Sequence, residues 1–152
     1  HYEVPTEFFK LILGQNLKYS CNFFDDISDP EKFYKNNSNI KKTNLSESEE
    51  NMLDLIIERS QIKPCMKILD LGCGWGSMSL YLAKKFPKAK ITACSHSKTQ
   101  RKHILNQCKE NNINNITVIT EDVNNLQLKE KFDRIISIEL FEHLQNYKII
   151  LN

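Results

Sequence analysis

The sequence predicts an α/β fold: a doubly wound, mostly parallel sheet with helices on both faces. Three observations support this. Short apolar segments typical of buried strands alternate with amphipathic segments of about 10–15 residues typical of helices. A glycine-rich turn, DLGCGWGS over residues 70–77, joins the first strand to the next helix. Because parallel strands connect through right-handed crossovers, we expect a ligand site beyond their carboxyl ends.

Composition restricts the classes of partner. The chain has 152 residues, of which 40% are hydrophobic, and a net charge of +2, with 21 basic and 19 acidic residues intermixed. This balance predicts no nucleic-acid partner. The apolar runs are far shorter than the roughly 20 residues that cross a bilayer, so we expect no transmembrane segment and a cytoplasmic location. Five cysteines without a C-x-x-C pair predict reduced thiols and no metal site.

The N-terminal part differs in pattern from the remainder. An aromatic and apolar helix is expected to begin near Thr6 and to end at Gly14. The polar stretch 25–45 is interpreted as an irregular connector. We therefore predict an N-terminal helical cap segment with its connector over residues 1–45, and a cofactor-binding core over residues 46–152.

The elements of the core follow in order. Ser46 and Glu49 have the spacing of a capping box, which predicts a helix from Ser46 to about Ser60. The pattern then predicts four strands: KILDL (67–71), KITAC (90–94), ITVIT (116–120) and FDRIISI (132–138). A helix over 77–86 is expected after the first strand, and a helix over 97–111 after the second, which a second capping box at Ser97 and Gln100 begins. A last helix is expected to start near Phe141.

The glycine turn indicates a nucleotide-like ligand, because glycine permits a tight turn and close approach of a ligand to the backbone. No lysine follows the glycines as in a P-loop, and Ser77 stands where a dinucleotide fingerprint has its third glycine. The pattern D-x-G-x-G-x-G resembles the first motif of class I S-adenosylmethionine-dependent methyltransferases. The resemblance implies S-adenosyl-L-methionine as cofactor, with its methionine part and ribose bounded by Asp70, Gly72, Gly74 and Gly76.

The loop after the second strand narrows the resemblance. The segment TACSHSKTQ lacks the acid that binds the ribose in many class I members, so neutral Ser95 and Gln100 take that role. GCGWGS followed by S-x-S-K-x-Q resembles the group of cyclopropane-fatty-acid synthases and coclaurine N-methyltransferases. This resemblance spans nearly the whole chain.

Three further segments resemble the same group. In LKYSCNFF (17–24) the resemblance places Tyr19 and Ser20 over the cofactor. In EDVNNL it places Asp122 near the exocyclic amine of the adenine and Val123 against the ring. SIELFEHLQNY (137–147) resembles the active-site segment, in a form nearer to the alkaloid N-methyltransferases than to the lipid-modifying enzymes.

The resemblance implies methylation of a small-molecule amine. Glu142 and His143 are candidate general bases, and Glu139 and Glu142 are expected on one helix face as an anionic lining for a cationic amine. The alternative for the glutamates is that they are solvated carboxylates at a helix start, and for the histidine a structural role. Trp75 is expected to pack between the first crossover helix and the sheet.

Two other functions stay open. One is cyclopropane-fatty-acid synthase-like methylene transfer to unsaturated phospholipid acyl chains, so that the substrate is an amine or a lipid. Class I methyltransferases normally have seven strands, and this sequence lacks the C-terminal ones. The other function is therefore a truncated cofactor-binding module without turnover, whose exposed sheet edge forms a homo-oligomer.

Overall fold

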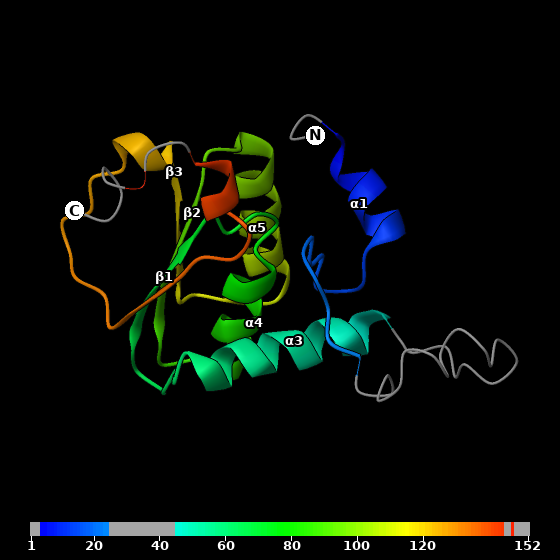
Figure 1. Ribbon diagram of the computed structural model, residues 1–152, viewed down its shortest axis with the longest axis horizontal. Helices are drawn as coiled ribbons and strands as arrows, with labels where there is room; N and C mark the ends of the chain where they lie inside the picture. The colour runs from blue at the N-terminus through cyan, green and yellow to red at the C-terminus, as the bar shows by residue number, and fades with distance from the viewer. Residues whose placement is uncertain (1–3, 25–44, 145–146, 148–152) are drawn as a thin grey trace, which may run out of the picture.

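A computed structural model describes residues 4–24, 45–144 and 147 of the chain; most of the expected connector, 25–44, lies outside this part. Its centre is a sheet of four parallel strands in the order β3-β2-β1-β4 (Figure 1). The strands are β1 (Lys67–Leu71), β2 (Lys90–Ser95), β3 (Ile116–Thr120) and β4 (Arg134–Ile136). The predicted α/β class and the predicted parallel pairing are confirmed.

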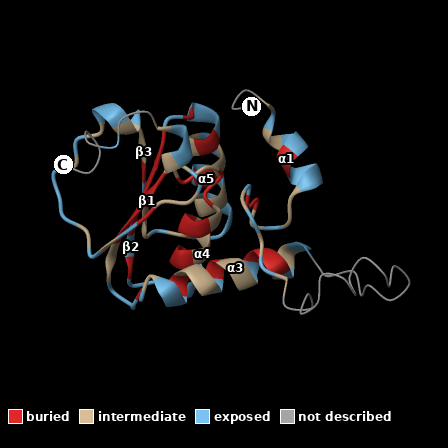
Figure 2. Ribbon diagram, viewed as in Figure 1, coloured by how far each residue is buried: buried red, intermediate tan, exposed pale blue. Residues whose placement is uncertain are grey.

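Three helices cover one face of this sheet: α3 (Leu45–Arg59), α4 (Ser77–Lys85) and α5 (Lys98–Glu110). Leu53 of α3 and Leu82 of α4 pack against Ile68 and Ile91, and Ile104 of α5 packs in a second cluster beside them. Burial is accordingly concentrated in the strands and on the inward sides of the helices (Figure 2).

Within residues 4–24 and 45–144, no α-helix packs on the opposite face; Tyr147, which follows, is helical, and the expectation of helices on that face stays a prediction. The crossovers from β1 to β2 and from β2 to β3 run in one direction, and right-handed crossovers in one direction place their helices on one face. The return from β3 to β4 crosses the other face as a segment with a single 3-10 turn, η1 (Val123–Asn125). Leu126, Leu128 and Phe132 of this segment pack on β1 and β2.

The expected helix over residues 46–60 is confirmed as α3, but its capping box is wrong. Ser46 lies inside the helix, and its hydroxyl oxygen accepts from the backbone N–H of Gln15 at 3.0 Å. Glu49 accepts from other N–H groups of the N-terminal segment. Side chains that suit a cap in sequence thus serve a tertiary contact with residues about 31–35 positions earlier.

The second predicted capping box is confirmed in part. Ser97 is the N-cap of α5, and its side chain accepts from the N–H of Gln100 at 3.3 Å. The Gln100 side chain accepts instead from the hydroxyl of Ser95. One half of the box therefore caps the helix and the other half belongs to the loop after β2.

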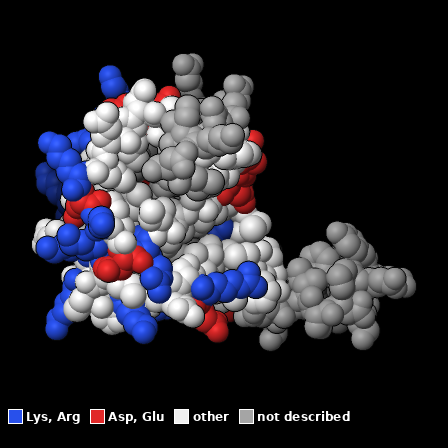
Figure 3. Space-filling model, turned by 60° about the vertical axis from the view of Figure 1, so that its left-hand side comes forward, with Lys and Arg blue, Asp and Glu red and all other residues white. Residues whose placement is uncertain are grey.

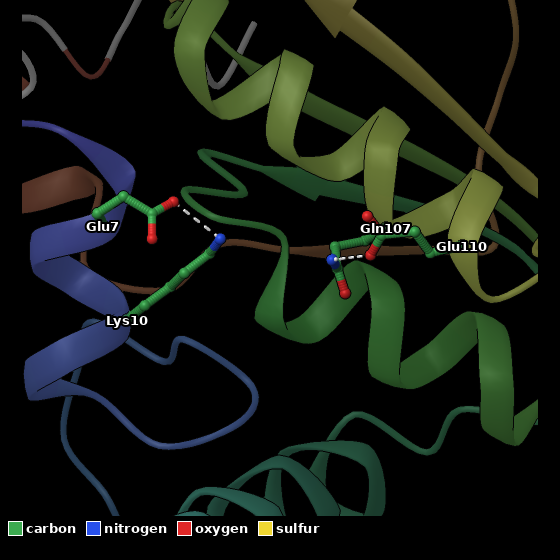
Figure 4. A network of polar contacts seen from close by, with 4 residues as sticks. All are labelled: Glu7, Lys10, Gln107 and Glu110. Carbon is green, nitrogen blue, oxygen red and sulfur yellow. Dashed lines mark hydrogen bonds and ion pairs between the residues drawn. The ribbon is translucent and has the colours of Figure 1, made fainter.

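The N-terminal segment forms α1 (Thr6–Ile12) and lies beside α5. Trp75 packs against Phe9 of α1, with ring centroids 4.9 Å apart, and against Leu17. The expectation that Trp75 packs between α4 and the sheet is therefore wrong, because this indole anchors the N-terminal segment. Polar side chains line the same junction, with Glu7 and Lys10 on α1 near Gln107 and Glu110 on α5 (Figure 4).

The surface carries intermixed charge. On the side seen in Figure 3, Lys and Arg side chains lie among Asp and Glu side chains. Within residues 4–24 and 45–144, no helix is both long enough and apolar enough to cross a membrane.

Candidate cofactor site

A cavity of about 410 Å³ opens at the carboxyl ends of the strands. Its walls come from the glycine turn, the loops after β2 and β3, the segment after β4, and the N-terminal segment. The structure brings together there most of the residues predicted from sequence: Tyr19, Ser20, Asp70, Gly72, Gly74, Ser95, Gln100, Asp122, Val123, Glu139 and His143. Gly76 and Glu142 are not among the lining residues.

Asp70 lies near the end of β1 and is 2% exposed. Its Oδ2 accepts a hydrogen bond from the Ser79 hydroxyl at 2.6 Å. Burial raises the pKa of this carboxyl from 3.8 to about 6, and the hydrogen bonds from Ser79 oppose the rise. A ligand cation at this position would stabilise the ionised form, so the site suits an ammonium group.

The three glycines of the turn all have positive φ, between 53° and 82°. A Cβ on Gly76 would lie 2.6 Å from Ile104 Cγ1, and one on Gly72 would lie 3.0 Å from Leu140 Cδ2. A Cβ on Gly74 would meet no atom within 4 Å and would project into open space beside the cavity. Gly72 and Gly76 are thus required by packing, whereas Gly74 leaves room for a ligand.

The loop after β2 presents a buried amide. Ser95 donates its hydroxyl proton to Gln100 Oε1, and Ser95 Oγ accepts from the N–H of Ser97 at 3.1 Å. Ser95 has then used its single donor. Because the Gln100 oxygen is held by Ser95, the Nε2 group of Gln100 is the donor that this pair offers to a hydroxyl in the cavity. The two residues act as one unit in place of a carboxylate.

The loop after β3 shapes the far wall of the cavity. Asp122 is exposed and caps η1, with Oδ1 accepting from the Asn124 backbone N–H at 2.9 Å and from its side chain at 2.8 Å. These hydrogen bonds lower the pKa of the Asp122 carboxyl from its usual value. Val123 packs over the cluster that contains Leu71 and Cys94 and presents an apolar surface to the cavity.

Residues 14–21, here called the strap, close the cavity from the N-terminal side. Cys21 N–H donates to Glu139 Oε1 at 3.0 Å, which joins the strap to the segment after β4. Lys18 is 1% exposed, and its ammonium group bonds to the Ser20 hydroxyl and the Cys21 carbonyl. Burial lowers the pKa of Lys18, and the nearby acidic groups oppose this. Sequence reasoning missed Lys18, because a lysine in an irregular segment carries no periodic signal of burial.

The segment after β4 corrects one expectation. Phe141–His143 form a single 3-10 turn, η2, and Glu139 precedes it with φ +50°, so Glu139 and Glu142 do not share a helix face. Leu140, which lies between the two glutamates in the sequence, packs against Gly72. Glu139 and His143 line the cavity, whereas Glu142 is exposed outside its lining.

Metal-ligating side chains do not gather in the part of the chain that is described: no three His, Cys, Asp or Glu residues there lie close enough to hold an ion. The five cysteines are free thiols. Burial raises the pKa of Cys73 and of Cys94 beneath the cavity. Their thiols therefore stay protonated and pack as small apolar groups.

Comparison of the sequence with known proteins finds similarity to N-methyltransferases and to cyclopropane synthases. Over 150 residues the chain is 39% identical to (S)-coclaurine N-methyltransferase of Thalictrum flavum subsp. glaucum, covering 99% of this chain and 38% of that protein. It is 29% identical over 149 residues to the cyclopropane-fatty-acyl-phospholipid synthase of Escherichia coli (strain K12), covering 97% of this chain and 34% of that protein.

Solved structures of the same kinds of enzyme share the fold. A coclaurine N-methyltransferase bound to N-methylheliamine and SAH superposes with a TM-score of 0.87 at 38% identity, covering 99% of this chain and 39% of that one. A mycolic acid cyclopropane synthase complexed with SAH and CTAB superposes with a TM-score of 0.75 at 27% identity, covering 94% and 45%.

The chain thus spans less than half the length of these relatives. The family model for mycolic acid cyclopropane synthetase matches residues 1–150. With the parallel sheet, the glycine turn and the cavity at the strand ends, this match establishes that the chain belongs to the mycolic acid cyclopropane synthetase family.

Proposed function

We propose that this chain is the cofactor-binding part of an S-adenosylmethionine-dependent methyltransferase that methylates a small-molecule amine. The observation that carries the proposal is the cavity at the strand ends. It brings together the buried carboxylate of Asp70, the buried amide of Gln100 and the apolar surface of Val123. The relatives support it, since the coclaurine N-methyltransferase structure holds SAH, the product of that cofactor.

The roles of the cofactor-binding residues follow from their chemistry. Asp70 pairs with the ammonium of the methionine part, and the backbone at Gly74 allows close approach. Gln100 Nε2 donates to the ribose. Val123 packs on the adenine, and Asp122 accepts from its exocyclic amine. Tyr19 and Ser20 of the strap lie over the nucleoside, while Gly72 and Gly76 shape the turn beneath it.

Methyl transfer from a sulfonium is an in-line displacement, so orientation and removal of the amine proton are the main demands. The Glu139 carboxylate and the His143 imidazole both border the cavity, which supports them as the groups that attract a cationic amine and accept its proton. Glu142 remains part of the proposal with less support, since it lies outside the cavity lining.

The main competing function is methylene transfer to unsaturated phospholipid acyl chains. It is supported by the family match and by the 29% identity to the cyclopropane-fatty-acyl-phospholipid synthase. The other competitor is a cofactor-binding module without turnover. Its support is that β4, at the edge of the sheet formed by the described residues, has only three residues, which suits pairing with a further strand or with a second copy of the chain.

Two arrangements expected from sequence remain proposals with this function. One is the division into a cap segment (1–45) and a core (46–152), which the separate cluster of Phe9, Leu17 and Trp75 supports. The other is homo-oligomerisation through β4. The cytoplasmic location stays a prediction.

Calorimetry with S-adenosylmethionine and SAH is the first test, and we expect binding of both at micromolar concentration. Absence of binding at high micromolar concentration would contradict all three functions. Transfer of labelled methyl to a panel of secondary and tertiary amines would support the amine reading, and transfer to vesicles of unsaturated phospholipid would support the lipid reading. Binding without transfer to either would identify the chain as a module, and light scattering would show whether it forms oligomers.

A further inference from the structure

Glu49 is a fully buried carboxylate on α3, outside the cavity lining. Its Oε1 accepts from the backbone N–H of Gly14 at 2.8 Å and of Lys18 at 3.2 Å, and its Oε2 accepts from that of Asn16 at 2.8 Å. One side chain thus binds three N–H groups of the strap. Hydrogen bonds of this kind to a charged acceptor are stronger than those between neutral groups.

The backbone N–H groups of residues 14–18, the first part of the strap, all have partners around this carboxylate. Gln15 N–H donates to Ser46 Oγ, one turn earlier on α3, at 3.0 Å, and Leu17 N–H donates to the Gly14 carbonyl at 3.1 Å. Every N–H from residue 14 to residue 18 therefore has a partner, and four of these five hydrogen bonds go to side-chain oxygens of α3. The strap has no sheet or helix ladder of its own, so α3 determines its path.

Gly14 is the chain's only glycine outside the glycine turn. A Cβ at this position would lie 2.5 Å from Glu49 Oε2 and 2.6 Å from Cδ. The φ of Gly14 lies outside the left-handed region, so backbone conformation does not demand glycine here. Glycine is needed here because the Glu49 carboxylate approaches the backbone closely.

The residues that this contact positions are those of the cavity. Leu17, Tyr19 and Ser20 line it, and the strap reaches Glu139 through Cys21 N–H at 3.0 Å. Two carboxylates, Glu49 and Glu139, therefore hold the strap at its two ends. The part between them lies against the ligand space.

We propose that Glu49 is a positioning residue, which holds the strap over the cofactor site through the three N–H groups and depends on Gly14 for its approach. The effect on cofactor affinity rests on the function proposed above, whereas the position of the strap does not. The core cluster of α3, with Leu53 and Ile57, is separate from the cluster of Leu17 and Trp75. Loss of the contact should therefore release the strap while the core stays folded.

Trp75, the single tryptophan of the chain, reports on the strap because it is 4% exposed and packs against Leu17 and Phe9. In Glu49→Gln one of the two accepting oxygens is replaced by an NH2 group, which cannot accept from the backbone N–H groups of the strap. We expect acrylamide quenching of Trp75 without ligand to rise about twofold, and SAH affinity to fall at least about tenfold, with an unchanged far-UV spectrum. The matched control is Glu50→Gln, an exposed neighbour on α3, which should leave both readings unchanged.

A double-mutant cycle ties the effect to this contact. Gly14→Ala should reproduce the rise in quenching, but should add nothing in a Glu49→Ala background, where the carboxylate that its Cβ would meet is gone. Unchanged quenching in Glu49→Gln, additive effects in the cycle, or collapse of the far-UV spectrum would each overturn the proposal. If the wild-type chain binds no SAH, the proposed function fails, while the quenching measurements still decide the role of Glu49.

Discussion

The Ser79 hydroxyl on α4 donates to the buried carboxylate of Asp70 on β1 at 2.6 Å. This hydrogen bond stabilises the ionised carboxylate only in part, because burial still raises the pKa of Asp70 to about 6. The ligand-free site therefore holds a carboxyl group that a cationic ligand would help to ionise.

The first prediction concerns stability and pH. The pKa of Asp70 is raised from 3.8 to about 6 on folding, so the folded chain holds the proton more tightly. The contribution of Asp70 to stability is complete below about pH 4 and is lost as the pH rises through 6, by on the order of 3 kcal/mol. Urea unfolding of ligand-free wild type and Asp70→Asn between pH 4 and 7.5 should show this loss in the wild type alone. Parallel pH profiles would contradict it.

The same carboxylate should control cofactor affinity. We expect Asp70→Asn to weaken SAH binding at pH 7.5 by about tenfold or more, because a charge-assisted hydrogen bond to the ammonium is lost. In the wild type the affinity should increase as the pH rises through 6. Calorimetry at several pH values measures both effects, and Asp54→Asn, on the exposed face of α3, is the control for a change of charge. Equal affinities of wild type and Asp70→Asn would exclude the proposed contact.

Substitutions of two glycines in the turn should affect stability and SAH binding differently. Gly76→Ala forces a Cβ to within 2.6 Å of Ile104 at φ +82°, so it should destabilise the fold by about 2–4 kcal/mol. Gly74→Ala meets no neighbour and should cost only about 1 kcal/mol for its φ of +53°, yet its methyl group enters the ligand space. Thermal unfolding and SAH calorimetry of both variants make the comparison. Normal SAH binding by Gly74→Ala would show that no ligand approaches there.

Acidification should loosen the N-terminal segment. His103 on α5 packs edge-to-face on Trp75 at 5.6 Å, and its pKa is lowered by burial and by Lys10, against the opposing pull of Glu110 and Glu7. A lowered pKa means that the unfolded chain binds the proton more readily, so this stability is present above about pH 6.5 and is lost as the pH falls.

The measurement for His103 is the emission of Trp75 between pH 8 and 5. We expect a red shift and stronger acrylamide quenching at the acidic end for the wild type. In His103→Gln this change should be much smaller, since the substituted side chain does not titrate. A wild-type profile that persists in His103→Gln would assign the change to another group.

The two glutamates after β4 should differ. Glu139→Gln removes a charge that borders the cavity and accepts from Cys21 N–H, so affinity for a cationic amine should fall by about tenfold. Glu142→Gln, outside the lining, should change it less than twofold. Titration of SAH-saturated protein with an amine substrate found in the transfer assay compares them. A larger loss in Glu142→Gln would reverse their proposed roles.

The sequence by itself determined the order of the core elements, because these depend on local signals. The apolar run before Asp70 and the helix that starts at Ser77 follow from patterns within about ten residues. A tight turn at the three glycines was likewise expected from their spacing, and the structure gives all three a positive φ.

Tertiary structure alone decided the contacts between distant segments. Glu49, predicted as half of a capping box, binds the backbone of residues 14–18, and Trp75 packs on the N-terminal segment. Glu139 lies before a 3-10 turn and reaches back to Cys21, 118 residues earlier. No local pattern encodes such pairs, because their free energy arises only once the sheet and α3 have brought the segments together.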